Sequence, residues 1–390
     1  MVKRKVLIAI HQLNLGGAQK ALISALNAID YSENDVTLYV RKAKLDLLPL
    51  INKNVSKIII NEDPNKYDHK PYALCLEILS RVCIALHKDH SHLDEKAREY
   101  ILRKQFKYEK KHYFSNSESY DIVVSYIQGY TAAFVAENVN ARKKVMFYHD
   151  STDSLHELHN EVMKHFEKIY CVSKGAQKAV QGFYPQFAEK IDCLENYVDA
   201  EKVRAEAEKF TLDYPNDKLI LCSCGRITPV KGFDLAVGAA DILRSKGLDF
   251  KWYFVGDGVD RPKIEALIAE KNLQDYIEIT GLQDNPYPYI KYCDIYVQPS
   301  YEEAHPLSII EAQILCKPIV STATVGGVSI INDGLTGMIS RIDPQSIAYK
   351  VYQLIYDDGL KAKIKSKLEK IDYQDDYRRF CDQWRELLNQ

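Results

Sequence analysis

The chain has 390 residues, of which 46% are hydrophobic and 27% are charged, and its formal net charge is −2 at pH 7. This length predicts two or three domains, each large enough to bury a core. The near-neutral charge gives no whole-protein attraction to nucleic acid. Nine cysteines, an odd number, together with no evident secretory signal or long apolar span, favour a cytoplasmic protein with reduced thiols.

The amino-terminal stretch predicts the start of a doubly wound sheet. Residues 5–10 (KVLIAI) form an apolar run typical of a buried strand, and a turn with Gly16 and Gly17 leads into an amphipathic helix. Ligands of such sheets bind beyond the carboxyl ends of the strands. The turn lacks a full G-x-G-x-x-G pattern, so a plain helix-start turn is the alternative to a ligand-facing loop.

Later apolar runs predict further strands of the same sheet at residues 35–40, 57–61, 121–127, 143–150 and 168–173. The strand at 143–150 ends in His149 and Asp150, at the edge where sites gather. A lone histidine is more often structural, but this position favours a role in a site. Lys174 follows the last of these strands at a helix start, where a solvated residue and a cleft residue are equally good interpretations.

A long helical stretch is predicted from about residue 71 to 114. Its last part, residues 96–114, holds seven Lys or Arg and two Glu, with Tyr and Phe interleaved. One interpretation is a solvated helix that packs its aromatic side chains on the sheet. The other is a basic amphipathic surface that meets anionic lipid, where each basic residue contributes about 1 kcal/mol. The sequence leaves both open.

A charged helix and a cluster of Asp, Pro and Asn at residues 212–217 precede a new apolar strand, which is a linker signal. We therefore place a domain boundary near residue 198. The predicted division is residues 1–198, residues 199–371 and a final helical segment at 372–390.

The second domain again opens with strand, glycine, loop and helix. Arg226 follows the strand and Lys231 precedes the helix. Two cations that converge on a helix start suit a diphosphate, because Arg offers a planar fork of donors and Lys a point charge. The alternative is a solvated charged surface.

A further strand–glycine–helix unit covers residues 251–268. Gly256 and Gly258 in its turn permit close approach of a ligand or of the other domain, and a role in the fold alone is equally compatible. Another strand follows at residues 276–283, with Leu282 near its end.

The stretch from 294 to 322 carries the most specific pattern. A short strand at 295–297 is followed by an acidic loop, and Pro306 stands where a helix should begin. The free amides of Leu307 and Ser308 at this helix start suit a phosphate. Glu303 and Glu311, with seven residues between them, are placed to grip hydroxyl groups on either side of that phosphate. For Glu311 the alternative is a capped or salt-bridged helix residue.

This pattern, preceded by Pro-Ser and followed by Ala and a Lys-Pro-Ile-Val turn, resembles the retaining glycosyltransferases of the GT-B fold, and among them family four, which uses nucleotide sugars. Landmarks of that family recur over nearly the whole chain. The resemblance implies an α/β protein with two Rossmann-like domains facing a cleft, the acceptor held by residues 1–198 and the donor by 199–371. The helix at 372–390 would cross back to the first domain.

The resemblance also implies roles for individual residues. The loop with Gly16 and Gly17 would face the donor phosphates and the acceptor, and His149 would contact the donor sugar. Arg226 and Lys231 would hold the leaving diphosphate. Other residues would bind the rest of the donor, namely Glu303 the sugar, Glu311 the ribose, and Leu282 the base. Spacing favours Glu303 over the adjacent Glu302.

The expected reaction is transfer of a hexose or N-acetylhexosamine from a nucleotide sugar, with UDP as the expected nucleotide, to a glycan or lipid-linked glycan in surface polysaccharide assembly. No metal or other cofactor is expected, because metal independence is usual in the resembled fold. Cys222 and Cys224 also lack a matching His or Cys pair nearby. The expected location is cytoplasmic, with peripheral attachment to the inner face of the membrane if residues 96–114 bind lipid.

One departure from the resembled motif keeps other functions in view. Gly-Phe-Gly is usual after the first Glu, whereas this chain has Ala304, His305 and Pro306. Pro306 has no N–H to donate. A non-catalytic GT-B subunit that binds sugar or partner within a larger transferase is therefore the main alternative. A nucleotide-sugar epimerase, which shares the fold, is a second enzyme alternative.

Overall fold

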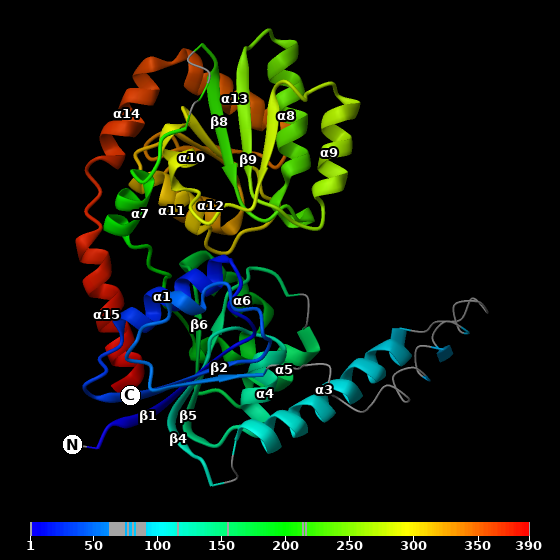
Figure 1. Ribbon diagram of the computed structural model, residues 1–390, viewed down its shortest axis with the longest axis vertical. Helices are drawn as coiled ribbons and strands as arrows, with labels where there is room; N and C mark the ends of the chain where they lie inside the picture. The colour runs from blue at the N-terminus through cyan, green and yellow to red at the C-terminus, as the bar shows by residue number, and fades with distance from the viewer. Residues whose placement is uncertain are drawn as a thin grey trace.

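The computed structural model describes residues 2–61, 75, 78, 79, 82, 91–114, 117–153, 156–212, 214 and 217–389, and for 91–99, 101, 102 and 157 it describes the backbone alone. These residues form two parallel sheets, each with helices on its faces, in two domains stacked along the long axis (Figure 1). The predicted α/β architecture of two Rossmann-like domains is confirmed. The predicted helical stretch between 71 and 90 lies largely outside the described residues.

The first sheet has seven parallel strands in the order β3-β2-β1-β4-β5-β6-β7. Strand order therefore reverses between β1 and β4. Residues Val6 to Ile10 of β1 are fully buried, as a continuous apolar run between two helical layers requires. The strands are β1 (Arg4–Ile10), β2 (Asn34–Val40), β3 (Lys57–Ile60), β4 (Tyr120–Ser125), β5 (Ala141–Tyr148), β6 (Lys168–Cys171) and β7 (Ile191–Cys193).

Alternate residues of β1 enter two different hydrophobic clusters, because side chains of a strand point to opposite faces. Val6, Ile8 and Ile10 join the cluster that contains α1. Leu7 and Ala9 join the cluster under α4, α5 and α6. The helices are α1 (Gly17–Ala28), α3 (Ser91–Tyr113), α4 (Tyr130–Asn138), α5 (His156–Met163) and α6 (Lys174–Phe183), with short 3-10 turns at Leu48–Leu50 and Pro185–Lys190.

The second sheet has six parallel strands in the order β10-β9-β8-β11-β12-β13, so its order reverses between β8 and β11. Its strands are β8 (Leu219–Cys224), β9 (Phe250–Val255), β10 (Ile277–Gly281), β11 (Ile295–Gln298), β12 (Ile319–Thr322) and β13 (Met338–Ser340). Strand β8 aligns Leu221 with Ile295 of β11 and with Trp252 of β9. The predicted strands of this domain are all present.

Helices cover both faces of the second sheet (Figure 1). One face packs against α8 (Phe233–Ser245), α9 (Arg261–Glu270), α13 (Pro344–Tyr356) and α14 (Asp358–Leu368). The other packs against α10 (Tyr287–Tyr292), α11 (Leu307–Ile314) and α12 (Val325–Ile330), and α7 (Ala200–Ala207) lies against α10 and α11. A 3-10 turn at Pro229–Lys231 leads into α8.

The last helix, α15 (Gln374–Asn389), lies against the first domain beside α1 (Figure 1). Phe380, Trp384 and Leu387 belong to the same hydrophobic cluster as β1 and α1. The indole of Trp384 is fully buried and stacks on Phe147 of β5, with 5.5 Å between ring centroids and 7° between planes. The carboxyl-terminal segment is therefore part of the core of the first domain.

Helix α3 extends outward from the first domain (Figure 1), and its carboxyl-terminal half is fastened to the sheet by a buried ion pair. Arg41 donates from Nη2 to Oε1 of Glu109 at 2.7 Å and from Nε to Oε2 at 3.0 Å. The hydroxyl of Tyr39 donates to Oε2 at 3.0 Å. Phe106 and Phe114 are buried beside this pair. No helix in the described part of the chain is long and apolar enough to cross a membrane.

We predict that Glu109→Ala lowers the free energy of unfolding of the first domain by about 3–5 kcal/mol, because it leaves the buried Arg41 charge without its carboxylate. Urea unfolding in a Trp252→Phe background makes Trp384 the reporter for this domain. Glu137→Ala is the control, since Glu137 forms an exposed pair with Arg103 and should cost less than about 1 kcal/mol. Equal losses for the two variants would contradict the prediction.

Candidate functional site

The two reversal points of strand order lie at the interface between the domains. A reversal opens a crevice beyond the carboxyl ends of the strands, where ligands bind in doubly wound folds. Figure 1 shows α1 and α6 of the first domain opposite α11 and α12 of the second, and α6 packs against α12. The predicted site residues follow the strands that end at this interface.

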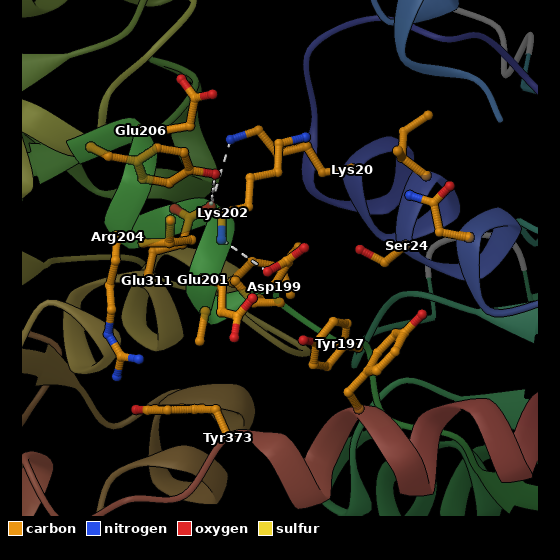
Figure 2. A pocket seen from close by; sticks show the side chains of 18 of the residues that line it. Lys20, Ser24, Tyr197, Asp199, Glu201, Lys202, Arg204, Glu206, Glu311 and Tyr373 are labelled. Atoms are coloured by element: carbon orange, nitrogen blue, oxygen red, sulfur yellow. Dashed lines mark hydrogen bonds and ion pairs between the residues drawn. The ribbon is translucent and has the colours of Figure 1, made fainter. Parts of the chain in front are cut away.

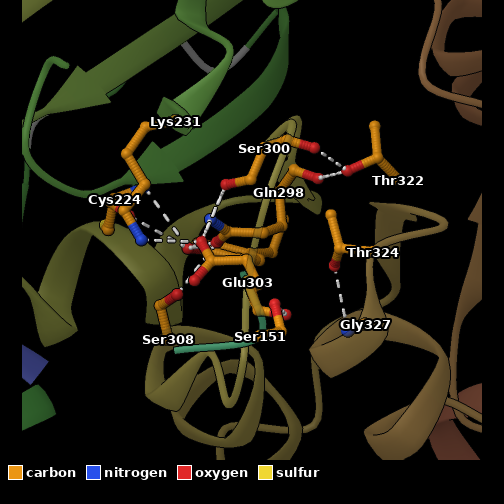
Figure 3. A network of polar contacts seen from close by, with 11 residues as sticks. Ser151, Cys224, Lys231, Gln298, Ser300, Glu303, Ser308, Thr322, Thr324 and Gly327 are labelled. Carbon is orange, nitrogen blue, oxygen red and sulfur yellow. Dashed lines mark hydrogen bonds and ion pairs between the residues drawn. The ribbon is translucent and has the colours of Figure 1, made fainter. Parts of the chain in front are cut away.

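The carboxylate of Glu303 lies at the centre of a polar network in the second domain (Figure 3). Its Oε1 accepts hydrogen bonds from Lys231 Nζ at 2.8 Å, from Ser300 Oγ at 2.8 Å and from Gln298 Nε2 at 3.0 Å. Only 8% of the residue is exposed. The structure thus brings together Lys231 and Glu303, which the sequence placed 72 positions apart.

The loop after Glu303 docks onto the first domain. The hydroxyl of Ser173 donates to the carbonyl of Ala304 at 2.6 Å, and the hydroxyl of Ser151 donates to the carbonyl of Glu303 at 3.4 Å. Within the second domain, Gly326 N–H donates to the same Glu303 carbonyl at 2.7 Å. The methyl group of Ala304 is buried in a hydrophobic cluster of the first domain. Alanine in place of the usual glycine therefore adds an apolar contact between the domains.

His305 and Pro306 complete this loop. Pro306 occupies the N-cap position of α11 with φ −72° and ψ 100°, where its missing N–H removes no helical hydrogen bond. Both ring nitrogens of His305 are buried, and neither has a hydrogen-bond partner within the described residues. Burial lowers the pKa of His305 to about 4, against a smaller opposite influence from the Val172 backbone. His305 is therefore a neutral ring at neutral pH.

His149 follows β5 and is buried near the same interface. Its backbone N–H donates to Gln128 Oε1 at 3.0 Å, and its ring lies 5.1 Å from that of Tyr126. Burial and, to a smaller extent, the nearby His305 lower the pKa of His149 to about 4, against an opposite influence from the Tyr126 backbone. Among the described residues, Nε2 of His149 has no hydrogen-bond partner. Contact of this ring with a donor sugar remains a prediction.

The neighbours of His149 in the predicted site are less central. Asp150 accepts hydrogen bonds from the backbone N–H groups of Ser151 at 2.8 Å and Thr152 at 3.2 Å, so it shapes the turn after β5. Lys174 is exposed at the first position of α6 and approaches Gln177 at 3.4 Å. Both side chains thus have hydrogen-bond partners within the first domain.

Glu311 lies on the second turn of α11, where the sequence placed it, with a side chain that is 6% exposed. Its Oε1 accepts a hydrogen bond from Tyr287 OH at 3.2 Å and lies 3.6 Å from Lys20 Nζ of the first domain. Figure 2 shows Glu311 and Lys20 at the wall of a pocket between the domains, which Tyr287 also lines. The pocket has a volume of about 980 Å³ and is also lined by Leu307 and Tyr197.

The two cations of the predicted diphosphate site differ in their surroundings. Arg226 is exposed directly after β8, and within the described chain no carboxylate lies at ion-pair distance from it. Lys231 is held by Glu303. Leu307 and Ser308 are the first two residues of α11, and Ser308 Oγ donates to Gln298 Oε1 at 2.9 Å. Arg226 is thus available to an anionic ligand without breaking an ion pair.

The predicted glycine positions fall into two groups. A Cβ atom on Gly256 would overlap the carbonyl oxygen of Gly225, and one on Gly258 would overlap that of Ile227. Close packing of the loop after β8 therefore accounts for both glycines. A Cβ on Gly17 would meet no atom within 4 Å, whereas one on Gly16 would overlap the side chain of Gln19. Space at the start of α1 is thus open beside Gly17.

Leu282, the predicted base contact, is 59% exposed just after β10. Sequence reasoning missed four other residues that contact the predicted carboxylates, namely Gln298, Ser300, Tyr287 and Lys20. Gln298 ends a buried strand directly before Pro299 and Ser300, and a polar residue there was a readable signal. Tyr287 and Lys20 lie far from Glu311 in the sequence, and no local pattern marked them.

Comparisons with known proteins show which families and folds the chain resembles. Residues 204–371 match the family model described as Glycosyl transferases group 1. The alpha-D-kanosaminyltransferase of Streptomyces kanamyceticus is 33% identical over 170 residues, 43% of this chain and 43% of that protein. The lipopolysaccharide core biosynthesis glycosyltransferase LpsE of Rhizobium meliloti is 26% identical over 200 residues, 51% of this chain and 57% of that protein. The chain spans about half the length of the curated relatives it matches.

Among solved structures, the crystal structure of Anabaena Alr3699/HepE in complex with UDP and glucose has a TM-score of 0.73 to this chain at 16% identity, covering 99% of each chain. A likeness at this identity shows the fold, which is GT-B. Arg226, Lys231, Glu303 and Glu311 lie within the residues that match the family model described as Glycosyl transferases group 1. The resemblance inferred from the sequence is therefore confirmed.

The buried, neutral state of His305 generates a prediction about pH. The folded protein keeps this ring neutral between pH 6.5 and 4, whereas the unfolded chain protonates it. The stability it contributes is therefore complete above pH 6.5 and is lost as the pH falls through that interval, by up to about 1.4 kcal/mol for each pH unit. We expect His305→Phe to make the loss of stability between pH 6.5 and 4.5 less steep.

Urea unfolding of both proteins at pH 7, 5.5 and 4.5 measures this effect. His165→Phe is the control, because His165 is exposed and its solvation changes little on unfolding. An unchanged slope in His305→Phe would show that the ring is already solvated in the folded protein.

Proposed function

We propose that the protein transfers a hexose or N-acetylhexosamine from a nucleotide sugar to a hydroxyl group of a glycan or lipid-linked glycan, with retention of anomeric configuration and without a metal ion. The observation that carries the proposal is the placement of two buried carboxylates on one loop–helix unit. Glu303 is held before the start of α11 and Glu311 follows on its second turn. This pair brackets a helix start that offers free backbone N–H groups.

The leaving group would be the nucleoside diphosphate. Its negative charge grows as the bond between the anomeric carbon and the phosphate oxygen breaks, and fixed donors that meet this charge lower the barrier. Arg226, Lys231 and the first amides of α11 would be the donors of this chain that meet this charge. Glu303 would accept a hydroxyl of the sugar, and Glu311 would accept the ribose hydroxyls.

Retention would follow if the acceptor attacks from the same face as the leaving group departs. The acceptor oxygen then forms the new bond to the anomeric carbon, and its proton passes to a phosphate oxygen of the departing diphosphate. This route needs no protein nucleophile, whereas a double displacement would need a carboxylate on the opposite face of the sugar.

The relatives guide the choice of substrates. The HepE crystal structure holds UDP and glucose, which supports UDP as the nucleotide. LpsE is named for lipopolysaccharide core biosynthesis, which supports a lipid-borne glycan as acceptor and a role in surface polysaccharide assembly.

Within the described residues, no group of three or more His, Cys, Asp or Glu is arranged to hold a metal. Metal independence remains part of the proposal.

The first test is a thermal-shift titration with UDP, GDP and ADP, each with and without a chelator. A ligand at about 100 times its dissociation constant adds roughly 2.7 kcal/mol to stability. We expect a shift selective for UDP that the chelator leaves unchanged. No shift with any of the three would favour a non-catalytic GT-B subunit. A separate incubation with a nucleotide sugar and no acceptor tests the epimerase alternative. A sugar that is changed in this incubation would identify an epimerase.

We predict that Arg226→Ala lowers the turnover of sugar transfer by about 100-fold or more, the scale of removing one donor from a developing oxyanion. Initial rates with a panel of UDP-sugars measure it, and the anomeric proton coupling of the product reports retention. Arg244→Ala is the control, because Arg244 lies on α8 and pairs with Asp241. Turnover near that of the unmodified protein in Arg226→Ala would refute the role given to Arg226.

We also propose that the basic side of α3 binds an anionic membrane surface, which would bring a lipid-linked acceptor to the cleft. Phe106 and Glu109 pack on the first domain, which supports the packing interpretation for that face. Lys107 and Lys111 are exposed on the same helix. The packing and membrane interpretations of residues 96–114 would therefore concern different faces of one helix, which extends from the body of the protein (Figure 1).

We predict that four Lys-to-Glu substitutions on α3 weaken co-sedimentation with vesicles of anionic lipid, because each basic residue near such a surface contributes about 1 kcal/mol. The positions are Lys104, Lys107, Lys110 and Lys111. The same charge change on α14 is the matched control, at Lys361, Lys363, Lys365 and Lys367. Equal binding by the two variants would return α3 to an ordinary solvated helix.

A further inference from the structure

Gln298, the last residue of β11, is a buried amide with every hydrogen-bonding position occupied. It is 4% exposed. Its Nε2 donates to Glu303 Oε1 at 3.0 Å and to Ser300 Oγ at 2.9 Å. Its Oε1 faces the hydroxyls of Tyr296 and Ser308, each at 2.9 Å. Two donors and two acceptors are all that a glutamine amide offers.

The partners determine which way the amide points. An ionised carboxylate only accepts hydrogen bonds, so the atom that faces Glu303 must be the nitrogen. The oxygen then faces Tyr296 and Ser308, and both hydroxyls must donate to it. The hydrogen bonds therefore run in one direction, from these hydroxyls through Gln298 to Glu303.

This direction has a consequence for each end of the network. At Glu303, Oε1 already accepts from Lys231, Ser300 and Gln298. In the described chain Oε2 accepts no hydrogen bond, so it is the oxygen left for a sugar hydroxyl. At α11, the Ser308 hydroxyl has its hydrogen engaged by Gln298. A phosphate at this helix start would therefore be bound through backbone N–H groups rather than through that hydroxyl.

We propose that Gln298 is a positioning residue for sugar transfer. It orients Glu303 so that Oε2 faces the donor sugar, and it links that carboxylate to the helix start that would hold the diphosphate. The inference rests on the proposed function, since it assigns Gln298 to the same site. A positioning role differs from a purely structural role, because the effect of Gln298 on turnover must pass through Glu303.

The test replaces Gln298 with methionine, which has a similar length but no amide. We expect kcat for transfer from UDP-glucose or UDP-N-acetylglucosamine to fall at least 10-fold in Gln298→Met. The affinity for UDP, measured by calorimetry, should stay within twofold, because UDP carries no sugar for Glu303 to bind. Gln313→Met is the matched control, since Gln313 is a buried glutamine of α11 outside this network.

A double-mutant cycle separates positioning from folding. If Gln298 acts through Glu303, the double variant Gln298→Met/Glu303→Ala should be no slower than Glu303→Ala alone, whereas independent effects would multiply. Ser300→Ala is a second variant with a smaller change in volume, and it should show the same non-additivity with Glu303→Ala. The cycle with Ser300→Ala keeps the inference testable if Gln298→Met folds poorly, because Ser300 accepts from Gln298 and donates to Glu303.

The possible results distinguish a failure of the role proposed for Gln298 from a failure of the proposed function. Multiplicative losses, or Gln298→Met turnover equal to that of the control, would overturn the positioning role while leaving a working transferase. Loss of UDP affinity together with turnover would overturn it in favour of a structural role. An unmodified protein that neither binds UDP nor transfers sugar would overturn the proposed function, and the role of Gln298 would fall with it.

Discussion

A carboxylate taken out of water must recover its lost solvation from protein donors, or its charge becomes too costly to bury. Glu303 recovers it at one oxygen, through an ammonium, a hydroxyl and an amide that come from two loops and a strand end. Those donors are themselves held by other groups, so the loop after β8, the end of β11 and the start of α11 form one connected unit. The geometry of the candidate donor site depends on this arrangement.

The loop after Glu303 forms hydrogen bonds between the domains. Ser173 both caps α6, by accepting from Ala176 N–H at 3.1 Å, and donates to the Ala304 carbonyl. The candidate donor site and the first domain therefore contact each other through residues that depart from the Gly-Phe-Gly motif. From the sequence alone, Ala304, His305 and Pro306 keep a non-catalytic subunit in view as an alternative. In the structure Ala304 has a packing explanation, because it enters a first-domain cluster, as does Leu307.

Much of the fold and of the candidate site was predictable from the sequence, because short-range patterns indicate it. Apolar runs located the strands, Pro306 marked the start of α11, and the spacing of Glu303 and Glu311 identified the loop–helix unit. Contacts between distant segments left no such pattern. The pairing of Lys20 with Glu311 depends on how two domains meet, and the Arg41–Glu109 pair depends on how α3 lies on the sheet. The glycines at 256 and 258 illustrate a further limit, because close packing of backbone and close approach of a ligand require the same residue.

The position of α15 bears on how the chain folds as it is synthesised. Trp384 and Leu388 complete a cluster whose other members include Val6 and Ile8. Domains generally fold as units, in order of synthesis, yet the first domain lacks part of its interior until α15 has left the ribosome. The second domain, by contrast, has its sheet and covering helices complete by residue 368. During translation the later domain is thus the first to have all of its core. The apolar surface of β1 and α1 in the earlier domain stays uncovered until α15 is made.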